Sequence, residues 1–108
     1  MAVIDELRTV AERMNADPEP IRSFQHVYQF DLSESGSFQV KFRDGRVEVS
    51  EGTPDTPECT LILSDANFEK LLRDDLNTTM AFMLGSLKVE GKLGLALKLQ
   101  EALKHYSN

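Results

Sequence analysis

Apolar residues at the start of the chain recur with the period of a helix. Val3, Leu7, Val10 and Met14 fall on one side of such a helix. The prolines that follow Asp17 end the pattern, because proline cannot continue a helix and also restricts the residue before it. The pattern predicts that the chain begins with one amphipathic helix.

Three alternating segments follow. Residues 24–32, 38–42 and 47–49 place apolar side chains at every second position, as strands with one buried face do. A turn rich in serine separates the first two segments, and Asp44-Gly45, a typical hairpin pair, separates the second two. The pattern predicts a three-stranded meander.

A fourth strand is predicted at residues 59–63. This run is apolar on both faces apart from Thr60, which indicates a strand that is central or covered by helices. Ser64 or Asp65 can cap the helix that follows, whose apolar positions continue to Leu76.

The last third of the chain predicts a helix, a strand and a helix. A short helix begins at Asn77 or Thr78 and ends at Gly85, since glycine readily adopts a left-handed C-cap. Residues 87–89 alternate as a fifth strand, and residues 92 to about 106 form a final helix. The predicted order is αββββααβα, which is an α+β domain.

This last third carries more apolar side chains than one surface helix needs. Between Leu76 and Leu103 nearly every helical face carries Leu, Met, Phe or Ala. A helix that is apolar over most of its circumference is buried on more than one side. The second side therefore faces a partner or an internal cavity, unless the whole stripe is simply core.

Length and composition indicate one soluble globular domain over residues 1–108. The chain is long enough to bury a core without disulfides, and its 41% hydrophobic and 28% charged residues are ordinary for that class. The acidic start lacks the features of a signal peptide, and the single cysteine agrees with a reducing compartment. We expect a cytoplasmic protein.

The net charge limits the partners that the chain attracts. Eighteen acidic residues against twelve basic ones give a net charge of −6, whose field repels phosphate backbones and anionic bilayers. We therefore expect no nucleic-acid partner and at most transient contact with membranes.

The chain shows no pattern typical of an enzyme. Cys59 lies within a strand pattern, far in sequence from His26 and His105, and the acidic pair Asp74-Asp75 has no His or Cys beside it. The glycines do not form a phosphate-binding loop. We expect no catalytic residue, no metal and no cofactor. The rival hypothesis, thiol chemistry at Cys59, predicts a thiol that labels rapidly at neutral pH.

Three linked segments carry a family resemblance. They are ECTLILSDANF at residues 58–68, AFMLGSLKVEG at residues 81–91 and LALKLQ at residues 95–100. Together they resemble the sterol carrier protein 2 domain, the nonspecific lipid-transfer type. The chain departs from the family pattern at residues 73–75, which replace a glycine-containing turn, and it ends without the Ser-Lys-Leu peroxisomal signal of some members.

The resemblance implies a five-stranded sheet covered by helices, with an internal hydrophobic tunnel that takes an acyl chain, a sterol or an isoprenoid-like lipid. Methionine and phenylalanine form adaptable apolar walls that suit such ligands. The implied function is non-catalytic lipid binding and transfer. The alternative is a protein-interaction module, or a homodimer, that uses the same apolar groove. By position, the predicted tunnel-lining residues are Met80, Phe82, Met83 and Leu84 of the short helix and Leu93, Ala96, Leu97 and Gln100 of the last helix.

Overall fold

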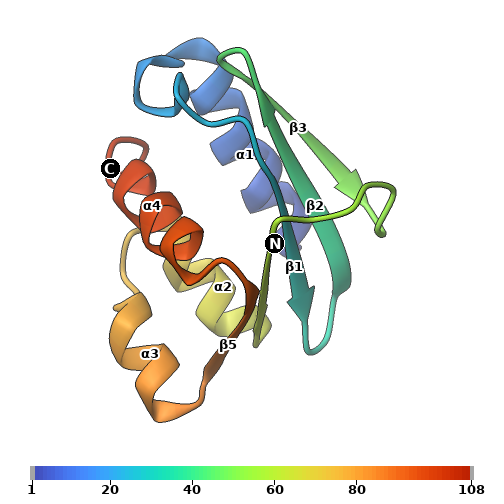
Figure 1. The fold of residues 1–108 in the computed structure, drawn as a ribbon, viewed down its shortest axis with the longest axis vertical. Helices are drawn as coiled ribbons and strands as arrows, with labels where there is room; N and C mark the ends of the chain where they lie inside the picture. The colour runs from blue at the N-terminus through green and yellow to red at the C-terminus, as the bar shows by residue number, and fades with distance from the viewer. Residues whose placement is uncertain (1, 108) are drawn as a thin grey trace.

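A computed structural model describes residues 2–107 as a five-stranded sheet with its α-helices gathered on one side (Figure 1). Residues 1 and 108 of the predicted domain lie outside the described residues. The elements are α1 (Val3–Ala16), the 3-10 helix η1 (Glu19–Ile21), β1 (Val27–Leu32), β2 (Gly36–Arg43), β3 (Arg46–Glu51), β4 (Cys59–Leu63), α2 (Asp65–Leu72), α3 (Thr78–Leu84), β5 (Leu87–Gly91) and α4 (Leu93–Leu103).

The sheet has the strand order β3-β2-β1-β4-β5. The predicted meander is confirmed, because β1 to β3 pair antiparallel in sequence order. β4 then pairs parallel with β1 on one side and antiparallel with β5 on the other. The α+β class and the predicted order of strands and α-helices are therefore confirmed.

Three predicted boundaries are wrong by a few residues. The first strand begins at Val27 and not at Phe24, because a turn follows η1 and holds Phe24 in the core without strand pairing. α2 ends at Leu72, so Leu76 lies in the linker to α3. α4 ends at Leu103, and residues 104–106 form a turn.

Local capping chemistry sets the ends of the short helices as predicted. The Ser64 hydroxyl accepts a hydrogen bond from the Asn67 amide at 3.1 Å at the start of α2. The Asn77 side chain accepts one from the Met80 amide at 2.9 Å at the start of α3. Gly85 ends α3 in the left-handed conformation, with φ of 82°.

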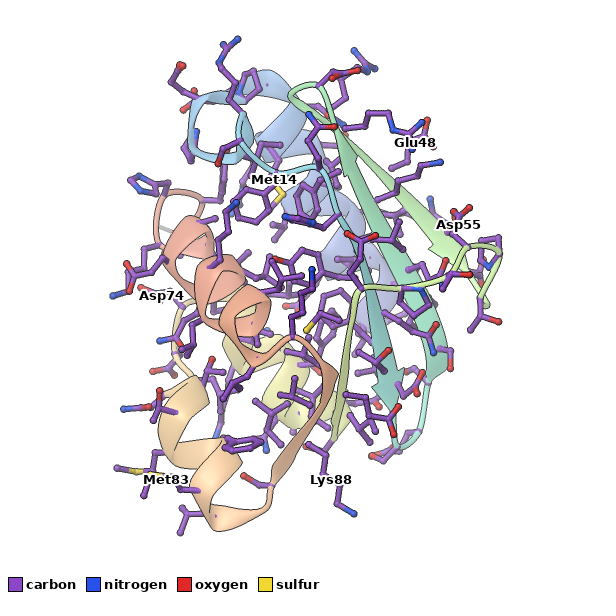
Figure 2. All side chains as sticks on the ribbon, viewed as in Figure 1. Met14, Glu48, Asp55, Asp74, Met83 and Lys88 are labelled. Atoms are coloured by element: carbon purple, nitrogen blue, oxygen red, sulfur yellow. The ribbon has the colours of Figure 1, made fainter. Side chains whose placement is uncertain are left out.

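The core lies between the sheet and the helices, and the opposite face of the sheet is polar. Phe42 packs against Phe24 and Tyr28, with ring centroids 5.0 and 5.6 Å apart. On the opposite face the Gln39 side chain is buried, donates to the backbone carbonyl of Asp55 at 2.7 Å and accepts from its amide at 2.9 Å. The loop that carries Asp55 (Figure 2) thus covers part of this face.

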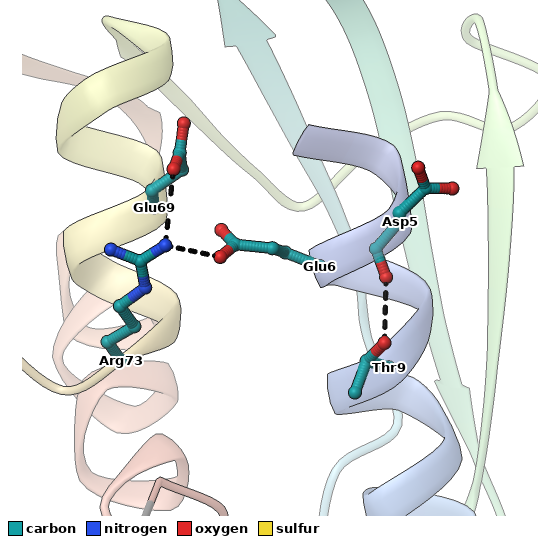
Figure 3. Close-up of polar contacts among 5 residues, drawn as sticks. All are labelled: Asp5, Glu6, Thr9, Glu69 and Arg73. Atoms are coloured by element: carbon teal, nitrogen blue, oxygen red, sulfur yellow. Dashed lines mark hydrogen bonds and ion pairs between the residues drawn. The ribbon is translucent and has the colours of Figure 1, made fainter. Parts of the chain in front are cut away.

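One arginine connects two of the helices, α1 and α2. Arg73, at the C-terminal end of α2, pairs with Glu6 of α1 and with Glu69 one turn earlier in its own helix (Figure 3). The acidic pair Asp74-Asp75 follows directly, and both side chains are exposed. Asp74 has a φ of 58°, which turns the chain out of α2.

Gly91, at the end of β5, lies against the backbone of the neighbouring strand. Its φ is 89°, and a Cβ at this position would lie 2.4 Å from the carbonyl oxygen of Glu58. The same carbonyl accepts a hydrogen bond from the Lys92 amide at 3.3 Å. A residue with a side chain at position 91 would therefore force the backbone of one of the two strands to move.

We predict that Gly91→Ala destabilises the protein more than Gly36→Ala does. Both glycines have positive φ, so both variants carry left-handed strain of about 1–2 kcal/mol. A Cβ at Gly36 meets nothing within 4 Å, whereas at Gly91 it meets the Glu58 carbonyl. We expect the Gly91 variant to lose about 2 kcal/mol more, measured as the free energy of unfolding in urea. Equal losses would show that the steric contact at Gly91 is unimportant.

Candidate functional site

The exposed large hydrophobic side chains of residues 2–107 all lie on α3 and the first half of α4. Met83 and Leu84 are the most exposed, at 79% and 77% of their full accessibility. We call this set the α3–α4 patch. It comprises Met80, Phe82, Met83, Leu84, Leu93 and Leu97.

The short length of α3 explains why its apolar residues are exposed. The helix has only seven residues between its Asn77 cap and its Gly85 stop, and among them Thr78 and Ala81 alone are buried. Met80, Met83 and Leu84, spaced by three and four residues, share the opposite side. Figure 2 shows Met83 pointing away from the body of the protein.

One side of α4 faces α3. Leu93, Leu97 and Gln100 are spaced by four and three residues and so share a side of the helix. The Gln100 side-chain oxygen accepts a hydrogen bond from the backbone amide of Thr78 at 3.1 Å, which places this side next to the start of α3. Ala96 lies next to this side on the surface of α4 and is buried, with 1% of its surface exposed.

The structure therefore gives different positions to the eight predicted lining residues. Ala96 is in the core, Gln100 is half-buried between the two helices, and the other six form the exposed patch. The second side of α3 is not covered in the single chain, so the reading of the whole apolar stripe as plain core is wrong for α3.

The space between sheet and helices is a small apolar cavity of about 20 Å³. It is lined by apolar side chains of α1, α2, α4 and the first three strands, among them Phe30, Leu71 and Leu99. None of the eight predicted residues lines it. Ligand pockets for small molecules usually measure about 300–1,000 Å³. An acyl chain can enter here only if the helical layer moves away from the sheet.

A larger hollow lies elsewhere and is lined in part by charged side chains. It measures about 380 Å³ and runs between α1 and the end of α2, beside Arg13 and Arg73. Its charged lining would leave a hydrocarbon ligand next to ionic groups, so it does not suit an apolar guest.

Two polar side chains near α3 and α4 were not predicted as site residues. Tyr28 of β1 is fully buried and donates from its hydroxyl to the Leu95 carbonyl of α4 at 2.8 Å. Burial raises the pKa of this hydroxyl, so it stays protonated. The Thr78 hydroxyl is buried and has no hydrogen-bond partner within residues 2–107. Sequence reasoning identified Thr78 only as a possible helix cap.

Comparison with known proteins decides the family. Residues 7–104 match the SCP-2 sterol transfer family. The chain belongs to this family. The resemblance predicted from three sequence segments is thus confirmed over nearly the whole chain.

Relatives with curated names include hydroxysteroid dehydrogenase-like protein 2 from two vertebrates. The Xenopus tropicalis protein is 38% identical over 88 residues, which is 79% of this chain and 21% of that protein. The Rattus norvegicus protein is 32% identical over 110 residues, which is 99% of this chain and 21% of that protein. The chain thus spans about a fifth of the length of these relatives.

Solved sterol carrier proteins share the fold. Sterol carrier protein domain 2 of Helicoverpa armigera is 25% identical with a TM-score of 0.71, and the match covers 97% of this chain and 87% of that one. Sterol carrier protein 2 of Aedes aegypti, solved with palmitate, is 20% identical with a TM-score of 0.75, and the match covers 99% of each chain.

The thiol of this SCP-2 family member lies in an environment unsuited to nucleophilic chemistry. Cys59 is 1% exposed, and burial raises the pKa of its thiol to about 11. His26 lies 2.8 Å from the carboxylate of Glu58 and makes no hydrogen bond to Cys59 in the described structure, and His105 is exposed. Within residues 2–107, no three His, Cys, Asp or Glu side chains group as metal ligands would.

Every helix in the described part of the chain is too short or too polar to cross a bilayer.

We predict that Cys59 reacts slowly with a thiol reagent at pH 8 while the protein is folded. With a pKa of about 11, only about one thiol in a thousand is ionised at that pH, and burial also blocks the reagent. Labelling followed by mass spectrometry should become fast once urea unfolds the chain. Rapid labelling of the native protein would instead support the thiol-enzyme hypothesis.

Proposed function

We propose that this SCP-2 family domain binds one hydrophobic molecule between its sheet and its helices and carries it, without catalysis, through the cytoplasm. The observation that carries the proposal is the α3–α4 patch, an exposed apolar surface on two helices whose inner sides pack into an apolar core. The palmitate complex of the Aedes aegypti protein, which has the same fold, supports this function.

The ligand path runs between α3 and α4 toward the interior. Leu93, Leu97 and Gln100 share the side of α4 that faces α3, and Ala96 lies just inside them. Phe82 is one turn from Thr78 on α3 and so lies on the side that meets Gln100. We assign these five residues to ligand contact, and we assign Met80, Met83 and Leu84 to the outer rim of the opening.

The hydrophobic effect is large enough to open the structure. Burying one methylene contributes about 0.8 kcal/mol, so ten methylenes contribute about 8 kcal/mol, which equals micromolar affinity before costs. α3 packs mainly against β5 and α4 and buries only Thr78 and Ala81. Moving this helix away from the sheet therefore exposes little apolar surface that the ligand does not cover again.

The polar end of the ligand has a candidate partner. The Thr78 hydroxyl is buried without a partner in the described structure, and a buried hydroxyl gains about 1 kcal/mol from a hydrogen bond. A carbonyl, carboxyl or hydroxyl group of the ligand beside the start of α3 would satisfy it. The proposed ligand class is therefore an acyl, sterol or isoprenoid-like molecule with one polar group.

The relatives suggest the setting in which such a domain works. In proteins named hydroxysteroid dehydrogenase-like, the matching part is about a fifth of the chain, which leaves room for a separate catalytic part. We propose that the present domain presents ligand and that chemistry, where it occurs, takes place elsewhere. A protein-interaction function of the same patch is the alternative, which sedimentation of the delipidated protein tests directly.

We predict one-to-one binding of a fluorescent long-chain fatty acid to the delipidated protein in vesicle-free buffer. Unlabelled acyl, sterol or isoprenoid lipids should displace the probe according to how well they fit. Leu97→Trp should weaken binding about tenfold or more, because the indole fills the path between α3 and α4, and it should change stability little at a half-exposed site.

Val49→Trp is the matched control. Val49 is half-buried on β3, at the opposite edge of the sheet from β5, and receives a similar enlargement. We expect the control to bind the probe like the parent. Failure of the folded, delipidated parent to bind any acyl chain, sterol or isoprenoid would refute the carrier function.

A further inference from the structure

We infer that Met80 and Met83 form an oxidation site, where a hydroperoxide converts the two thioethers of the α3–α4 patch to sulfoxides and thereby weakens binding of the hydrophobic ligand. The inference rests on the proposed carrier function, because both side chains belong to the rim assigned to the ligand opening. Met83 is 79% exposed and Met80 is 57% exposed. They are three residues apart on α3 and so share one side of the helix.

The methionines of the described structure divide sharply by exposure. Residues 2–107 contain three of them, Met14, Met80 and Met83. Met14 of α1 is 3% exposed and lies in the core, whereas Figure 2 shows Met83 pointing away from the body of the protein. A dissolved oxidant must collide with the sulfur atom, so access limits the rate. The two methionines of α3 are therefore oxidised before Met14.

The reaction requires only an accessible thioether and a hydroperoxide. A lone pair of the methionine sulfur attacks the outer peroxide oxygen, so that an S–O bond forms as the O–O bond breaks. The proton of the outer oxygen moves to the departing oxygen, which leaves as an alcohol, or as water when the oxidant is hydrogen peroxide. Methionine loses two electrons and the peroxide gains them.

Mild oxidation changes the patch and spares the core. The other members of the patch carry no sulfur; they are Phe82, Leu84, Leu93 and Leu97. Besides the methionines, Cys59 is the one sulfur-containing residue of the described part of the chain. Cys59 is 1% exposed, and burial raises the pKa of its thiol to about 11, so the thiol is neither accessible nor ionised at neutral pH.

Oxidation of these two side chains acts on the liganded state more than on the free protein. A sulfoxide is polar, whereas the thioether it replaces is apolar. In the unliganded domain both groups face water, so a sulfoxide at these positions stays hydrated. A ligand that covers the rim removes this water without supplying a hydrogen bond, which is unfavourable for a polar group. The oxidised domain therefore holds an apolar ligand less tightly.

Peptide mass mapping during treatment with dilute hydrogen peroxide tests the site. We expect Met80 and Met83 to gain oxygen at least about tenfold faster than Met14, in proportion to access. The oxidised protein should bind the fluorescent fatty acid about fourfold more weakly, which is the effect of losing roughly one buried methylene. Treatment with methionine sulfoxide reductases should restore the affinity, because these enzymes return the sulfoxide to the thioether.

Three variants assign the effect to α3. Met80→Leu/Met83→Leu removes both sulfur atoms and keeps the side chains apolar, so its affinity should be the same before and after peroxide. Met80→Gln/Met83→Gln carries polar groups of similar length and should match the oxidised parent without peroxide. Met14→Leu is the matched control, a substitution of similar volume in the core, and peroxide should still weaken its binding as it does in the parent. Circular dichroism confirms that each variant is folded.

The outcomes separate this site from the carrier function. Oxidation of Met14 as fast as Met83 overturns the inference, and so does equal affinity of the oxidised and untreated parent. Loss of affinity on peroxide treatment of Met80→Leu/Met83→Leu overturns it as well, since the sensitive group then lies elsewhere. A folded parent that binds no fatty acid refutes the carrier function and with it the effect on the ligand. The peptide map alone then decides whether Met80 and Met83 are the oxidation site.

Discussion

The close approach of Gly91 to the carbonyl of Glu58 fixes how β5 leads into α4, the helix that carries half of the candidate site. Here β5 ends beside the start of β4, and the Lys92 amide bonds to the same carbonyl one residue before α4 begins. Tyr28 then holds the first turns of α4 through the Leu95 carbonyl, and Gln100 holds the start of α3. The direction of α4, and so the side on which Leu93 and Leu97 meet α3, follows from a crossing that only glycine permits.

The protein combines a nearly filled interior with an exposed apolar surface. The interior is almost filled, with a cavity of about 20 Å³, whereas six large apolar side chains lie outside. A filled interior keeps the unliganded domain stable, since an empty tunnel would forfeit the dispersion contacts of its walls. Exposed Met83 and Leu84 have no such stabilising contacts in the single chain, so contact with another surface explains these side chains better than folding does.

Much of the fold was predictable from the sequence because its signals are local. The caps at Ser64 and Asn77 and the stop at Gly85 depend on neighbouring residues, and the meander follows from alternation and a hairpin pair. The start of the first strand at Val27 was missed because Phe24 is buried at the end of a turn. Its apolar side chain continues the alternating pattern of the strand although it is not paired in the sheet. Periodicity also showed that α3 is apolar, but which side is covered depends on the distant contact between Thr78 and Gln100. The match of residues 7–104 to the SCP-2 sterol transfer family confirmed the family, and the role of the eight predicted lining residues stays a proposal.

The parallel pairing of β1 with β4 has a consequence for the order of assembly. The two strands are adjacent in the sheet but separated in the chain by β2, β3 and a long loop, so joining them closes a loop with a considerable entropic cost. We therefore expect the local hairpins to form before β4, β5 and the last helices pair with them. Since α3 contacts the rest of the protein mainly through the edge strand β5 and α4, we expect it to form last and to loosen first in the native state. The topology thus places the weakest cooperative unit of the molecule at its most apolar surface.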